Sequence, residues 1–193
     1  MSANTSDSLN ERGRSLEEEF FRRDDERLLQ KLREKQAAES ARDALSKATG
    51  ITNPSVLDRL IALEVRPEMA TALMIVPLVE VAWADGTLDA KERELVMAQA
   101  RTSNLAEGSP ELALLESWLK QRPGPKLLAA WTLTIQGLVQ KMEPDEIARL
   151  KSGLLDRARN VAKASGGVLG IGKVSSQEEA MLTKLGSAFP PTK

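Results

Sequence analysis

The sequence predicts an all-α protein: a compact bundle of about seven helices, preceded by a long charged N-terminal helix. Three observations carry this prediction. Apolar residues recur at helical spacing along most of the chain, and no stretch alternates with the period of two that is typical of strands. Most apolar segments begin at a proline, serine or aspartate, which are typical helix starts. The joints between segments are short, which favours antiparallel neighbours.

The N-terminal part is polar and charged. Residues 1–14 are expected to be disordered, because they contain little that could be buried. Residues 15–50 are predicted to form one amphipathic helix, with Ser15 and Glu18 as a capping box and Gly50 at its end. A narrow apolar stripe is formed by Phe21, Leu28, Leu29 and Leu32. The pattern lasts barely two heptads, so a solvated arm and a short coiled coil with another chain both stay open.

Residues 51–193 are predicted to form the helical domain. The expected helices cover 54–63, 67–84, 89–101, 109–121, 125–142, 144–164 and 175–188. Pro54 and Pro125 suit the first turn of their helices. Apolar residues surround nearly the whole circumference of the second of these helices. It should therefore be buried at the centre of the domain, with a kink at Pro77.

The most distinctive stretch ends that apolar helix, turns at Asp85-Gly86 and opens the next helix. Gly86 can adopt the positive φ that ends a helix. Asp89 stands at the next N-cap with Glu92 three residues later, so one interpretation is a capping box worth roughly 1 kcal/mol. The other interpretation is that Asp85, Asp89 and Glu92 converge on a divalent cation. The residues leave both interpretations open.

This turn has an echo near the C-terminus. Residues 161–166 align with 81–86, and after a six-residue insertion residues 173–178 align with 87–92. The alignment predicts two pseudo-repeated helix–turn–helix units.

The first turn, Ala84-Asp85-Gly86-Thr87-Leu88-Asp89-Ala90-Lys91-Glu92, resembles the tellurite-resistance TerB-like domain family. The resemblance covers roughly residues 67–188. The family is all-helical, with two related halves that each carry a pattern close to Ala-Asp-Gly-x-aliphatic-x-x-x-Glu. The resemblance implies that the acidic turns bind divalent metal. It also implies a link to tellurite resistance and other stress responses, and to membrane-associated complexes.

The second half of the chain departs from the family pattern. Ser165 replaces the aspartate, Ser175 stands opposite Asp89, and only Glu178 stays acidic. We therefore expect at best one weak metal site. Its ligands would be Asp85, Asp89 and Glu92, with Glu178 as a fourth ligand if the two turns face each other.

The amino-acid composition limits the metals, catalytic mechanisms and partners that the chain could use. The chain contains no cysteine, histidine or tyrosine, so any metal must be held by oxygen ligands, which favours Ca²⁺, Mg²⁺ or Mn²⁺ and argues against Zn²⁺. The usual pairing of a nucleophile with a histidine base cannot form, and we expect no enzyme activity. With 27 basic and 28 acidic residues, bulk charge does not indicate nucleic-acid binding.

The longest apolar stretch, 72–84, is interrupted by Pro77 and Glu80 and is shorter than the roughly 20 residues that span a bilayer. No signal peptide is visible. We expect a cytoplasmic protein with no transmembrane segment, and a peripheral membrane complex stays open.

Two further features have competing interpretations. Glu80, inside the apolar helix, is expected to pair with Arg93 or Arg157, or else to contribute to the acidic site.

The glycine-rich loop 165–172 contains part of a P-loop pattern. However, Val174 stands where a P-loop has Ser or Thr, and a helix rather than a strand precedes it, so no nucleotide is expected.

The sequence thus indicates a non-enzymatic TerB-like binding or sensing module, modulated by a weakly bound divalent cation. Its N-terminal helix would serve self-association or docking to a protein partner. The alternative is a purely structural protein–protein interaction domain in which the acidic turn acts only as a helix cap.

Overall fold

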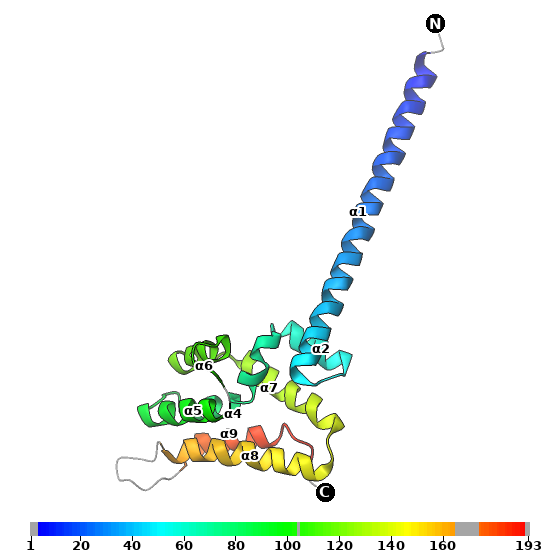
Figure 1. Ribbon diagram of the computed structural model, residues 1–193. Helices are drawn as coiled ribbons and strands as arrows, with labels where there is room; N and C mark the ends of the chain where they lie inside the picture. The colour runs from blue at the N-terminus through cyan, green and yellow to red at the C-terminus, as the bar shows by residue number, and fades with distance from the viewer. Residues whose placement is uncertain (1–3, 104, 165–173, 192–193) are drawn as a thin grey trace. The chain divides into compact units, whose positions relative to one another are not determined.

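The computed structural model confirms the all-α prediction (Figure 1). It describes the backbone of residues 4–103, 105–164 and 174–191, and the side chains of these residues apart from those of 4–21 and 24. Within these ranges there are nine α-helices, two short 3₁₀ helices and no strand. The chain divides into two units, residues 1–43 and 44–193.

The first unit consists of most of α1, which spans Asn4–Thr49. The helix therefore begins well before the expected start at Ser15 and includes most of the residues expected to be disordered. No proline lies in this stretch, so nothing in the backbone prevents the helix from continuing to Asn4. The last turn of α1 belongs to the second unit, where Leu45 is 1% exposed and part of the hydrophobic core.

The second unit contains the remaining helices: α2 (Pro54–Ala62), η1 (Pro67–Met69), α3 (Ala70–Leu73), α4 (Val76–Ala82), α5 (Ala90–Thr102), α6 (Pro110–Lys120), α7 (Pro125–Leu138), η2 (Val139–Lys141), α8 (Pro144–Ala164) and α9 (Ser176–Gly186). The predicted start signals act as expected. Asn53 accepts a hydrogen bond from the Ser55 N–H at the start of α2, and Ser109 accepts one from the Leu112 N–H at the start of α6.

The apolar segment predicted as one kinked helix is divided into η1, α3 and α4. Pro77 lies in the first turn of α4. Its ring has no N–H to donate and clashes with the carbonyl one turn earlier, so the regular helix ends at Leu73 and resumes at Val76. All residues of α4 are buried, as expected for the central helix.

The two predicted helix–turn–helix units, α4–α5 and α8–α9, pack against each other (Figure 1). Helix α8 contacts both α4 and α5, and α9 contacts α4 and α8. Aligned positions have matching environments: Val81 and Ala82 are fully buried, and so are Val161 and Ala162. This packing brings the N-termini of α5 and α9 into the same region of the molecule, where the candidate site lies.

Candidate functional site

The acidic turn between α4 and α5 is organised by its own hydrogen bonds. Gly86 has φ +96°, a left-handed conformation that only glycine adopts without strain. Asp85 Oδ1 accepts hydrogen bonds from the Thr87 N–H (2.9 Å) and the Thr87 hydroxyl (3.1 Å). Asp89 Oδ1 accepts one from the Glu92 N–H (2.8 Å), and Glu92 Oε2 accepts one from the Asp89 N–H (3.0 Å). The capping-box interpretation is therefore realised in full.

The capping box is repeated at the start of α9. Ser175 Oγ accepts a hydrogen bond from the Glu178 N–H (3.1 Å), and Glu178 Oε2 accepts one from the Ser175 N–H. Serine and aspartate are comparably good N-caps, so the exchange of Asp89 for Ser175 between the repeats preserves the cap. Glu92 and Glu178 occupy equivalent positions, and each is only 4% exposed.

Glu178 lies close enough to Glu92 for its charge to act on the Glu92 carboxyl. Burial is the largest cause that raises the pKa of Glu92, and the hydrogen bond from the Asp89 backbone opposes it. The charges of Asp89, Glu178 and Asp85 add smaller increases, and together these effects raise the pKa of Glu92 to about 7. The four residues predicted as metal ligands therefore share one electrostatic environment. The carboxylates of Asp85, Asp89 and Glu178 favour the protonated form of Glu92 near neutral pH.

These residues are not arranged as a coordination sphere. In the part of the chain whose side chains are described, no group of three or more acidic side chains is placed to hold a metal ion. Asp89 and Glu92 each use an oxygen in the capping box, and the exposed Asp85 binds Thr87. Ser165 and the glycine-rich loop 165–172 lie outside the described residues. The weak cation site stays a prediction.

The first turn is anchored to the end of α6 by two contacts that sequence reasoning missed. Trp83 Nε1 donates a hydrogen bond to the Trp118 carbonyl (2.9 Å), and Arg93 Nη2 donates one to the Leu119 carbonyl (2.7 Å). The final carbonyls of a helix have no intrahelical partners, and a cation there also complements the helix dipole. These contacts connect the first repeat to the end of α6.

Glu80 does not have the partners predicted for it. Arg93 binds the Leu119 carbonyl, and Arg157 Nε donates to the Gly153 carbonyl one turn earlier in α8. Burial raises the pKa of Glu80, whereas the charges of Arg122 and Lys184 act to lower it. These cations come from the α6–α7 connection and from α9. No local sequence signal relates either of them to α4.

Two open cavities of about 610 and 640 Å³ share Leu63 and Pro125 among their lining residues. The first is lined in part by Arg59 and Lys184, and the second by Arg122. Since the chain has neither histidine nor cysteine, these cavities offer no imidazole base or thiolate nucleophile.

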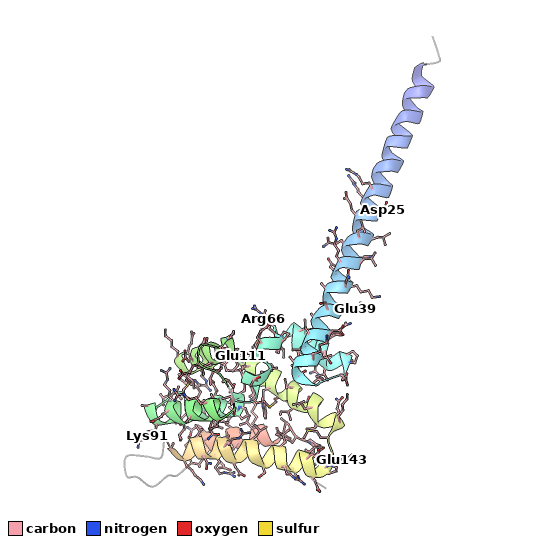
Figure 2. The ribbon with its side chains drawn as sticks, viewed as in Figure 1. Asp25, Glu39, Arg66, Lys91, Glu111 and Glu143 are labelled. Atoms are coloured by element: carbon pink, nitrogen blue, oxygen red, sulfur yellow. The ribbon has the colours of Figure 1, made fainter. Side chains whose placement is uncertain are left out.

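Exposed apolar surface is concentrated on α1. Among residues with described side chains, the exposed large hydrophobic ones are Leu28 (52%), Leu29 (53%) and Leu32 (61%). All three belong to the stripe noted in the sequence. Figure 2 shows side chains such as Asp25 and Glu39 extending from α1 with no other element of its unit beside them.

No protein-family model matches the chain, and neither a curated protein nor a solved structure matches it. The likeness to TerB-like domains therefore rests on the residues of the acidic turn and its echo. In the described part of the chain, none of the helices combines the length and apolar character needed to cross a membrane.

Proposed function

We propose that this chain is a non-enzymatic protein–protein interaction module in which α1 is the docking element and the acidic turn is a helix cap. The observation that carries the proposal is the exposure of Leu28, Leu29 and Leu32. Burying a leucine side chain is worth roughly 1.5–3 kcal/mol, so three exposed leucines on one helix represent a large unused driving force for association.

The environment of α1 supports the same conclusion. Every residue from Asp25 to Ala41 is exposed. Most helical stability in proteins comes from packing an apolar face, and isolated helices are marginal in water even with favourable sequences. A partner that covered the leucines would supply the packing that this stretch lacks within its own unit.

The hydrogen bonds of the acidic turn support the cap. A capping box accounts for Asp89 and Glu92 without a metal, and Ser175 with Glu178 forms the same motif. A cation-dependent version of the module draws its support from the charges of Asp85, Asp89 and Glu178, which act together on the Glu92 carboxyl. A role in stress response draws its support only from the resemblance of residues 84–92 to the TerB-like pattern.

Photo-crosslinking of the full chain, in the cells that make it, tests the docking role. A photoreactive phenylalanine derivative replaces Leu29 in one variant and Gln30 in the other. Residues in a helix are about 100° apart, so Gln30 lies on the side away from the stripe and is the matched control. We expect protein adducts at position 29 in clear excess over position 30. Equal yields, or no adduct at position 29, would overturn the docking role.

A further inference from the structure

We propose that α1 pairs in an antiparallel orientation with α1 of a second copy of this chain. Leu28 of one copy packs against Leu32 of the other, and Asp25 of one lies opposite Lys35 of the other. This inference rests on the proposed function and commits it to one partner.

Two leucines of the stripe and two charged residues of α1 have the spacing of a short coiled-coil seam. Asp25, Leu28, Leu32 and Lys35 are separated by three, four and three residues, the a/d spacing, so they lie on one side of the helix. Leu29 lies at the edge of this side. The two leucines form the apolar centre of the seam, and the two charged residues flank it at similar distances along the axis.

Charge decides the orientation of the pair. Two parallel helices in register would place Asp25 against Asp25 and Lys35 against Lys35, and both contacts would be repulsive. Antiparallel helices centred between Leu28 and Leu32 place Asp25 against Lys35 at both ends of the apolar centre. The same four residues therefore favour the antiparallel pair and disfavour the parallel one, which is how flanking charges select orientation in coiled coils.

The contact that Lys35 makes within its own chain leaves this side chain available to a second copy. Lys35 Nζ lies 4.0 Å from Glu39 Oε1 on the same helix, with both side chains largely exposed. Such exposed pairs contribute little, so Lys35 can turn to a carboxylate of the second copy. With only two leucine layers, the pair should be weak, with a dissociation constant of roughly 10⁻⁵ M.

Disulfide trapping in the full-length protein tests orientation and register. The chain has no cysteine, so an introduced thiol has no competitor. Tagged Asp25→Cys is mixed with untagged Lys35→Cys and oxidised, and each variant is also oxidised alone. Antiparallel pairing predicts a mixed disulfide in the mixture and almost none in either single sample, where equivalent thiols would be about 15 Å apart. Gln30→Cys is the control for random collision.

A charge-reversal cycle provides the second test, with the dissociation constant measured by sedimentation. Asp25→Lys and Lys35→Asp should each weaken the dimer roughly tenfold, because both end contacts become repulsive. The double variant should restore wild-type affinity. The three tryptophans, Trp83, Trp118 and Trp131, all lie in the second unit, so unchanged fluorescence unfolding curves show that its fold is intact.

The outcomes separate the two proposals. Self-disulfides in both single-variant samples would overturn the antiparallel orientation. A mixed-disulfide yield no higher than that of Gln30→Cys, or a cycle without restoration, would overturn the register. Monomers at all concentrations would exclude the second copy. If position 29 still formed adducts with another protein, the docking role of α1 would stand while this inference would fail.

Discussion

Glu178 of α9 acts on Glu92 of α5: its charge raises the pKa of the Glu92 carboxyl, although each residue closes the capping box of its own helix. Burial makes the larger contribution to this shift. The packing of the repeats therefore places two carboxylates near each other. Each stabilises the capping box of its own helix, but the two repel each other when both are ionised. This arrangement has a direct consequence for stability.

The stability of the second unit should fall as pH rises toward neutrality. Glu92 has a folded pKa of about 7, raised from 4.5, so the folded protein binds this proton more tightly than the unfolded chain. The stabilisation is complete below about pH 4.5 and is lost as pH rises through 7. Between pH 5 and 8 we expect a loss on the order of 2 kcal/mol in the free energy of unfolding.

Urea unfolding followed by tryptophan fluorescence measures this loss. Glu92→Gln should flatten much of the slope, because glutamine can still accept the Asp89 N–H hydrogen bond but does not ionise. Some slope should persist, since burial also raises the pKa of Glu80. An identical pH dependence in wild type and variant would contradict the assignment of the slope to Glu92.

Asp89 should behave as an N-cap. Asp89→Ala removes the acceptor for the Glu92 N–H and should lower the free energy of unfolding by about 1 kcal/mol, whereas Asp89→Ser should be close to wild type. Thermal and urea unfolding of the two variants provide the comparison. Equal losses for alanine and serine would show that Asp89 acts through its charge rather than as a cap.

Calorimetric titration of Ca²⁺, Mg²⁺ and Mn²⁺ separates the cap from a cation site. We expect no saturable binding below about 1 mM, because the carboxylates of the turn already serve as hydrogen-bond acceptors. Binding with a dissociation constant near 10⁻⁴ M that Asp85→Asn/Asp89→Asn abolishes would instead establish the cation-dependent module. Trp83 beside the turn provides an independent fluorescence signal.

Two helical glycines should respond in opposite ways to alanine. A Cβ at Gly137 in α7 would lie 3.0 Å from side-chain atoms of both Ile51 and Val56, which are buried. Gly137→Ala should therefore destabilise by about 1 kcal/mol despite the better helix propensity of alanine. Gly153 in α8 is exposed with nothing within 4 Å, so Gly153→Ala should stabilise by up to about 1 kcal/mol. Denaturant midpoints measure both, and a stabilising Gly137→Ala would show that the α2–α7 contact yields easily.

Glu64 offers a second position at which a substitution should stabilise the fold. It follows α2 with φ +65°, a left-handed conformation that is costly for residues with a Cβ. Glu64→Gly should raise the free energy of unfolding by about 1 kcal/mol. Glu64→Gln is the control: it removes only the exposed ion pair with Lys126 (3.8 Å) and should change little. Equal effects of both substitutions would assign the change to that ion pair.

Local signals in the sequence were sufficient for most of the secondary structure. Pro54, Ser109 and Ser175 start helices as predicted, because a cap depends on residues two or three positions away. The echo of residues 81–92 predicted the α8–α9 unit, and the capping box at Asp89 was one of the two interpretations offered. The start of α1 at Asn4 was missed, since a polar stretch without proline carries no strong signal against helix or for it.

The sequence by itself determined most of the helical elements and the capping boxes at the starts of α5 and α9, all of which depend on neighbours within about one helical turn. Only the tertiary structure decided that Arg93 binds the Leu119 carbonyl, that Arg122 and Lys184 act on Glu80, and that Glu178 acts on Glu92. Each of these relationships joins residues far apart in the chain. They arise from how the helices pack, and burial sets the strength of the charges involved, so no pattern along the chain could specify them.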